Sequence, residues 1–141
     1  MANTIQVHIV SAESEIWSGE AAMVFASAEQ GGMGIAPRHA PLLTRLEPGE
    51  VRVRKPDNEE FTFFVSGGIL EIQPHLVSIL ADTAQRARDL DEAAAAEARQ
   101  RAQEALENRQ GEMDIGRAQA ELAEATARLR LIQKMRRQRS A

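Results

Sequence analysis

The chain has 141 residues, enough for one domain or for one small domain with an appendage. Apolar residues make up 43% and charged residues 27%, with a formal net charge of −4, which is ordinary for a globular cytosolic protein. The absence of cysteine excludes disulfides, thiolate nucleophiles and zinc–sulfur sites, and no segment reads as a membrane span or a signal peptide.

The first 85 residues have the pattern of short strands. Apolar and polar residues alternate in TIQVHIV and EVRVRK, and FTFFVS and HLVSILA are further short apolar runs. Turn residues such as SG, GG, EPG, PDN and QP interrupt the pattern every eight to twelve residues. This spacing predicts an all-β sandwich or barrel of eight to ten strands.

After residue 85 the pattern becomes helical. RDLDEAAAAEARQRAQEALEN begins with Asp89 as a helix cap and Glu92 three residues later, and QGEMD supplies a glycine break with Asp114 as the cap of a second helix. Apolar residues in both helices recur at spacings of three and four, which predicts an antiparallel helical hairpin. The predicted seam consists of Ala95, Ala98, Ala102 and Ala105 in the first helix and Ile115, Ala118, Leu122, Ala125, Leu129 and Ile132 in the second.

The seam of this hairpin is expected to be weak. Alanine methyls bury little surface, and each buried methylene contributes only about 0.8 kcal/mol. Helix propensity is high in both segments, so each helix can persist when the two separate. Periodicity alone leaves a permanently docked hairpin equally open.

Charge is distributed unevenly along the chain. Residues 1–85 carry 5 Lys/Arg against 11 Asp/Glu, whereas residues 86–141 carry 12 against 10. Two readings are open: an acidic partner for the basic end of the chain, or a solvated helix end whose cations complement the helix dipole. The basic residues of the last seventeen positions, which hold no acidic residue, are Arg128, Arg130, Lys134, Arg136, Arg137 and Arg139.

No catalytic or metal-binding motif is found. GGMG is not followed by the Lys-Ser/Thr of a phosphate-binding loop, and there is no G-x-S-x-G or H-E-x-x-H. His8, His39 and His75 are widely separated, so no metal site is expected. A small hydrolase using His39 is a remaining alternative, in which the His39→Ala variant would lose turnover.

Several motifs in series match one family. GMGIAPRHAPLLT, EPGEVRV, VSGGILEIQP and ILADTAQRARDLDEA resemble the epsilon subunit of bacterial F-type ATP synthase, and VHIVSAESEIWSGEA and AQAELAEATARLRLI fit it as well. The resemblance covers nearly the whole chain in order. It implies an N-terminal antiparallel β-sandwich over residues 1–86 and a C-terminal antiparallel two-helix hairpin over residues 87–141.

The resemblance also implies a function. Epsilon subunits are non-catalytic parts of the central stalk at the cytoplasmic face of the bacterial inner membrane. Their sandwich binds the gamma subunit and the c-ring and helps couple proton flow to ATP synthesis. Their helices extend along gamma into the alpha/beta hexamer and inhibit ATP hydrolysis. No nucleic acid is expected as a partner, and the membrane is reached only through the c-ring.

Two sets of residues carry these expected contacts. By resemblance, a glycine-rich loop faces the c-ring, and His39 lies beside it. The resemblance implies that His39 is an interface or loop-ordering residue and not a catalytic base. The alternative is that the prolines on either side of His39 only stiffen a turn. The loop residues are Gly31, Gly32, Met33 and Gly34. The six cations Arg128, Arg130, Lys134, Arg136, Arg137 and Arg139 are expected to contact the hexamer, whose beta subunit presents an acidic segment in this family. Many relatives carry an acidic residue where this chain has Gly32, and Glu29 is a nearby substitute.

ATP binding is expected to be weak or absent. Some members of the family bind ATP through Ile/Leu-Asp-x-x-Arg-Ala, and here Leu90 and Asp91 match while Ala94 replaces the arginine. Of two arginines that those members use on the second helix, one aligns with Thr126 and the other is retained as Arg130. Each lost charge-assisted hydrogen bond removes about 1.5–3 kcal/mol. A freestanding module that senses a nucleotide with its hairpin is a second alternative, but its binding site would lack two cations. No cofactor is expected.

Overall fold

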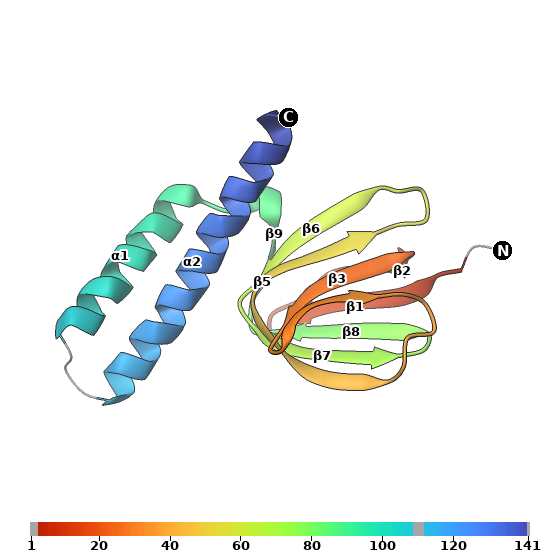
Figure 1. Cartoon of the computed structure of the whole chain (residues 1–141), viewed down its shortest axis with the longest axis horizontal. Coiled ribbons are helices and arrows are strands. Elements are labelled where there is room, and N and C mark those ends of the chain that lie inside the picture. The colour runs from red at the N-terminus through yellow and green to blue at the C-terminus, as the bar shows by residue number, and fades with distance from the viewer. Residues whose placement is uncertain (1–2, 109–111, 141) are drawn as a thin grey trace. The chain divides into compact units, whose positions relative to one another are not determined.

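A computed structural model describes residues 3–108 and 112–140, with side chains for residues 3–108 and 115–138. The chain divides into two compact units (Figure 1), one up to Arg88 and one from Asp89 onward. The sequence placed the boundary after residue 86. Arg86 ends the last strand, and a short 3₁₀ helix, Ala87–Asp89, follows it.

The first unit is a β-sandwich, as predicted. In the residues that the structure describes it has nine strands, which form one continuous hydrogen-bonded sheet. They are β1 (Ile5–Ser11), β2 (Glu15–Ala21), β3 (Met23–Ala28), β4 (Gly31–Ile35), β5 (Leu42–Arg54), β6 (Glu60–Val65), β7 (Gly68–Gln73), β8 (Leu76–Ala81) and β9 (Ala84–Arg86).

The strands run in the order β2-β1-β8-β7-β5-β3-β4. In addition, β6 pairs with the second part of β5, and β9 pairs with β6. All pairs are antiparallel except β1 and β8, which run parallel over Gln6–Ser11 and Leu76–Ala81. The expected antiparallel sandwich is therefore corrected at this one pair. The reason is topological: β1 lies between its hairpin partner β2 and a strand nearly seventy residues later.

Strand β5 is shared by the two layers. Its first part, from Leu42 to Leu46, pairs with β7, and its second part, from Gly49 to Arg54, pairs with β6. The register against β3 shifts between Ala26 and Ala28, which marks a bulge opposite the EPG segment. A bulge bends a strand, so the sheet folds over and its two inner faces meet.

The inner faces form one apolar core. The described residues include no buried polar or charged residue. The fully enclosed side chains include Val7 and Ile9 from β1, Val51 and Val53 from β5, and Phe63 from β6. These are the alternate residues of the predicted strands, because successive side chains of a strand point to opposite faces. Burial of an aliphatic or aromatic side chain contributes about 1.5–3 kcal/mol, so this core holds the sandwich in one shape.

The second unit is the predicted antiparallel hairpin of α1 (Glu92–Asn108) and α2 (Glu112–Ser140). The cap of α1 is Asp91, whose Oδ1 accepts a hydrogen bond from the Ala94 amide at 3.2 Å. Asp89, the predicted cap, ends the 3₁₀ helix, so that prediction was wrong. Asp114 lies within the first turn of α2 and so does not precede it as a cap. The glycine break at Gly111 falls outside the described residues.

The seam is as thin as the sequence indicated. Ala95 and Ala102 of α1 are buried, as are Ala118, Ala125 and Leu129 of α2. Four further residues of the predicted seam are half-buried: Ala98, Ile115, Leu122 and Ile132. Leu131 is buried although it lies outside the heptad positions.

One seam residue was predicted wrongly. Ala105 is exposed, and Leu106 is half-buried instead. At 100° per residue, position 105 lies roughly 80° from Ala95 around the helix and position 106 roughly 20°. A straight helix drifts away from a strict heptad in this way. Among the described residues no helix is long and apolar enough to cross a membrane.

At Gly68, strands β7 and β8 lie too close together for a side chain to fit. Its φ is +139°, and a Cβ there would stand 2.2 Å from the Leu80 carbonyl oxygen. Because that neighbour is backbone, the clash cannot be relieved by a side-chain rotation. We expect Gly68→Ala to lower the free energy of unfolding, measured with urea, by about 2–4 kcal/mol.

Gly32→Ala is the matched control. A Cβ at Gly32 meets nothing within 4 Å, and its φ lies outside the left-handed range. We expect a change within about 0.5 kcal/mol. Equal losses in the two variants would contradict the geometry of the β7–β8 pair.

Candidate functional site

The first candidate surface is the glycine-rich segment at the end of the sheet. Residues Gly31–Gly34 were expected to be a loop but lie in strand β4, which pairs with β3 and ends the strand order. The correction has a local cause, because glycine at Gly31 takes a φ of +126° and lets the chain turn back against β3. A Cβ added at Gly31 or Gly32 would meet nothing within 4 Å, so the backbone of β4 is open on its surface.

The side chains around β4 are placed as follows. Met33 is partly buried against the sandwich core. Glu29, the expected acidic substitute for Gly32, is exposed in the β3–β4 turn, and its amide donates to the Arg45 carbonyl at 2.9 Å. The structure therefore puts a carboxylate at one end of β4.

The proline-flanked segment after β4 is tied down by hydrogen bonds. The Arg38 amide donates to the Pro74 carbonyl at 2.9 Å, and the His39 amide donates to the Ala36 carbonyl at 3.2 Å. His39 Nδ1 lies 2.7 Å from the Ala40 carbonyl oxygen. Because a carbonyl oxygen can only accept, Nδ1 is the donor. The imidazole thus holds its own loop, which agrees with a loop-ordering role.

Arg38 adopts a φ of +66°, an uncommon conformation for a non-glycine residue. Its side chain is exposed. The segment therefore presents a cation beside β4 on a backbone whose shape is fixed at both ends. Within the described parts of the chain, no group of three or more His, Asp or Glu residues could hold a metal ion.

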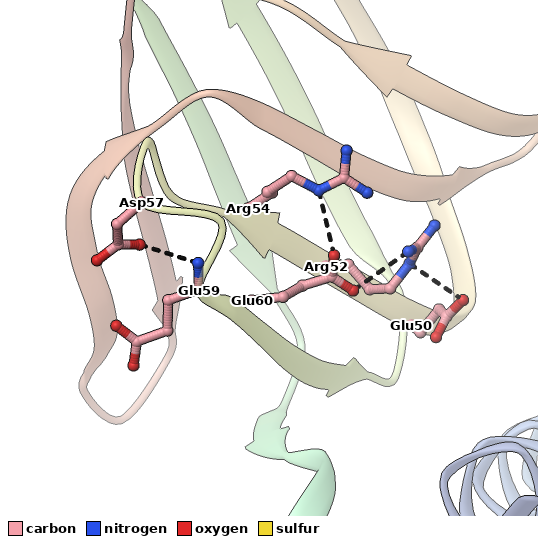
Figure 2. A network of polar contacts seen from close by, with 6 residues as sticks. All are labelled: Glu50, Arg52, Arg54, Asp57, Glu59 and Glu60. Carbon is pink, nitrogen blue, oxygen red and sulfur yellow. Dashed lines mark hydrogen bonds and ion pairs between the residues drawn. The ribbon is translucent and has the colours of Figure 1, made fainter. Parts of the chain in front are cut away.

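A second surface is a polar network on the outer face of β5 and β6 (Figure 2). The Glu60 carboxylate accepts from Arg52 Nη1 at 3.2 Å and from Arg54 Nε at 3.3 Å, and Arg52 Nε lies 3.7 Å from Glu50 Oε1. Both guanidinium groups lie over Phe25, with Cζ at 4.3 and 5.2 Å from the ring centroid. The two arginines and two glutamates of the network sum to zero charge, so the network favours neither an anionic nor a cationic ligand.

The network continues into the β5–β6 turn. Asp57 Oδ1 accepts from the Glu59 amide at 2.9 Å, and the Lys55 amide donates to the Glu59 carbonyl at 2.8 Å. This turn fixes the register that brings Arg54 opposite Glu60. A pocket of 280 Å³ lies beside the network and is lined by Phe25, Ala26, Ser27, Gly32, Met33, Gly34, Glu50 and Arg52.

A third surface carries three exposed apolar side chains and was missed by the sequence reasoning. Charged residues lie between them, because Glu71 is opposite Leu43 and Arg45 is opposite Ile69. Leu43, Ile69 and Leu80 are 67%, 44% and 50% exposed and lie on the neighbouring strands β5, β7 and β8. Leu80 is opposite Ile69 on one side and Val10 on the other. The signal was present as the doublets Leu42-Leu43, Ile69-Leu70 and Leu80-Ala81, because two consecutive apolar residues in a strand face opposite sides. We call Leu43, Ile69 and Leu80 the apolar face.

The six predicted cations do not form one stripe on α2. At 100° per residue, Arg130, Lys134 and Arg137 lie within roughly 60° of one another, whereas Arg128 and Arg136 lie on another side of the helix. Arg128 Nη2 donates to Glu124 Oε1 at 2.8 Å, and Arg136 pairs with Glu92 of α1. Arg130 and Arg137 are exposed and Lys134 is half-buried. Arg139 lies in α2, and its side chain is outside the described residues.

The residues expected at a nucleotide site have other roles in the hairpin. Asp91 caps α1 through its carboxylate, and Leu90 beside it is half-buried. Arg130 is exposed on α2, while Ala94 and Thr126 bring no charge.

The fold defines a protein of two parts, a β-sandwich followed by an antiparallel helical hairpin. The ATP synthase delta/epsilon chain β-sandwich domain matches residues 4–87, and the long α-helix domain of the same chain matches residues 88–133. The ATP synthase epsilon chain of Nitrosococcus oceani is 62% identical over 136 residues, 96% of this chain and 97% of the relative. That of Alkalilimnicola ehrlichii is 61% identical over 135 residues, 96% of each chain.

Solved structures agree on the fold. A chain of the Euglena gracilis mitochondrial ATP synthase, from a structure of OSCP, F1 and c-ring, has a TM-score of 0.80 at 18% identity, covering 89% of this chain and 79% of that one. The chain thus belongs to the epsilon chains of F-type ATP synthase, which are non-catalytic subunits.

Proposed function

We propose that this chain is a rotor subunit of the central stalk, which couples the c-ring to gamma during ATP synthesis and inhibits ATP hydrolysis when its helices extend. The observation that carries the proposal is the contrast between the two units. The sandwich has a large apolar core, whereas the hairpin is joined mainly by alanine-sized contacts. A rigid unit suits the transmission of torque, and a weak seam suits reversible opening.

The apolar face is the surface that we assign to gamma. Leu43, Ile69 and Leu80 lie on three adjacent strands that are held by the core beneath them. Exposed apolar side chains gathered on one rigid face favour a protein partner, because burying them removes apolar area from water. The network of Glu50, Arg52, Arg54 and Glu60, which has no net charge, gives no comparable driving force.

Substitution of the apolar face tests this assignment. We expect Leu43→Gln combined with Ile69→Thr to weaken binding to recombinant gamma by at least about tenfold, since each loses the burial of several methyl or methylene groups. Isothermal titration calorimetry measures the change. Both side chains are exposed, so the fold is retained.

Glu59→Gln in the β5–β6 turn is the control, and it should leave gamma affinity unchanged. Unchanged affinity in the Leu43→Gln/Ile69→Thr variant would exclude the apolar face as the contact.

We assign β4 and the segment through His39 to the c-ring. Gly31 and Gly32 leave the strand backbone open, and the His39 side chain is hydrogen-bonded to the Ala40 carbonyl in the following loop. With glycine at position 32, the polar contact available in this region comes from Glu29 or Arg38. The subunit would thereby lie at the cytoplasmic face of the inner membrane as a peripheral protein.

The helices carry the inhibitory role in this proposal. Hairpin opening would release α2 toward the alpha/beta hexamer, where the cations Arg128, Arg130, Lys134, Arg136, Arg137 and Arg139 meet acidic groups. High helix propensity supports this, because α2 can stay helical without α1.

Truncation separates the two roles. A chain of residues 1–86 should bind gamma with the same affinity as the full chain and support ATP synthesis, because the core and the apolar face are intact. ATP hydrolysis by the reconstituted enzyme should rise when the helices are absent. Hydrolysis assays and a gamma pull-down of both chains measure this; loss of gamma binding on truncation would refute the division of labour.

We propose further that the chain does not use ATP as a regulatory ligand. Asp91 is engaged as a helix cap, and Ala94 and Thr126 supply no positive charge. The loss of two charge-assisted contacts weakens a triphosphate site by about 3–6 kcal/mol.

An NMR titration of the isolated chain tests this point. We expect millimolar ATP to cause no chemical-shift change in α1 or α2. A dissociation constant in the micromolar range would contradict the proposal and favour a nucleotide-sensing hairpin.

A further inference from the structure

The two ends of the hairpin are joined by an ion pair. Glu92 is the first residue of α1, and Arg136 lies near the end of α2, 44 positions later. Arg136 Nη2 donates to Glu92 Oε2. Figure 1 shows the start of α1 beside the C-terminal part of α2, at the end of the hairpin opposite its connection.

Other ion pairs of the hairpin differ in one respect. Arg117 pairs with Glu121 and Arg128 pairs with Glu124, each four residues apart within α2. These pairs survive when α2 moves as an intact helix. The Glu92–Arg136 pair joins the two helices, so it must break before they separate.

The position of the pair matters because the seam is thin. Ala95 and Ala102 of α1 and Ala118 and Ala125 of α2 are buried, and their methyl groups supply little apolar area to hold the helices together. The connection between the helices restrains the other end of the hairpin. Glu92 and Arg136 lie at the end of the hairpin that has no covalent connection between the helices, so their ion pair acts together with the buried side chains of α2, Leu129 and Leu131 among them, in holding this end closed.

We propose that Glu92 and Arg136 form an electrostatic latch that holds the hairpin closed and sets the fraction of open chains. The regulatory consequence rests on the proposed function: Arg136 is one of the cations assigned to the hexamer, so an acidic partner competes with Glu92 for it. The latch itself is a property of the isolated chain. The Arg136 side chain is 62% exposed and the Glu92 side chain 48%, so the pair responds to ionic strength.

The absence of cysteine allows a direct measurement of opening. Ala102, 1% exposed in the seam, is replaced by cysteine and treated with a maleimide. When the hairpin closes faster than the maleimide reacts, the labelling rate is proportional to the fraction of chains with an open hairpin, however small that fraction is. Ala105→Cys, at an exposed position of the same helix, gives the rate of an unprotected thiol.

Glu92→Gln should raise the Ala102→Cys labelling rate about two- to fivefold, the range of an exposed ion pair. One molar salt should raise the parent rate by a similar factor and leave the Glu92→Gln rate nearly unchanged. Glu121→Gln, which breaks the pair with Arg117 inside α2, is the matched control and should leave labelling unchanged.

A double-mutant cycle separates the pair from an effect of Glu92 on the dipole of α1. If the two residues act as a latch, Arg136→Gln has the same effect as Glu92→Gln, and the double variant is no faster than either. Independent effects would multiply instead, and that result would overturn the proposal. Equal acceleration by Glu121→Gln, or none by Glu92→Gln, would also overturn it.

Reconstituted enzyme then distinguishes the latch from the proposed function. Glu92→Gln leaves all six cations in place, so the expected result is stronger inhibition of ATP hydrolysis. Faster labelling with unchanged hydrolysis would keep the latch and refute the inhibitory role of the helices. Unchanged labelling refutes the latch, whatever the hydrolysis assay gives.

Discussion

The bend in β5 is the constraint on which the sandwich depends. One strand pairs with β7 through its first part and with β6 through its second, and the register shift against β3 lies between the two. The bend brings the two inner faces together and encloses one apolar core. The same strand carries Leu43 on one outer face and Arg52 on another. These two outer surfaces therefore keep a fixed relation to each other within the sandwich.

The two units are stabilised in different ways. The sandwich buries branched and aromatic side chains, whereas the buried residues of the hairpin are mostly alanine. Packing of small side chains brings helices close but removes little apolar area from water. Helix propensity and pairs such as Arg117–Glu121 stabilise each helix by itself and do not stabilise the contact between them. Each helix is therefore stabilised more by its own residues than by contact with the other helix.

Much of this arrangement could be predicted from the sequence, because alternation and the change of period at residue 85 are strong signals. The finer predictions failed where two local signals competed. Asp89 and Asp91 both precede α1, and only the structure shows that the Asp91 carboxylate meets the Ala94 amide. GGMG looked like a loop because glycine disfavours strands, but pairing with β3 outweighs that preference. The apolar face required knowing which strands are neighbours, and that information is not local.

The parallel pairing of β1 with β8 has a consequence for biosynthesis. Strand β1 lies between β2 and β8, and its partner β8 is completed only at Ala81, long after β1 has been synthesised. Until then, one edge of β1 and its apolar side chains Ile5, Val7 and Ile9 lack their final neighbours. Contacts between residues so far apart in the chain form slowly, because the intervening loop must close first. The nascent sandwich thus completes its fold late, after β8 has been synthesised.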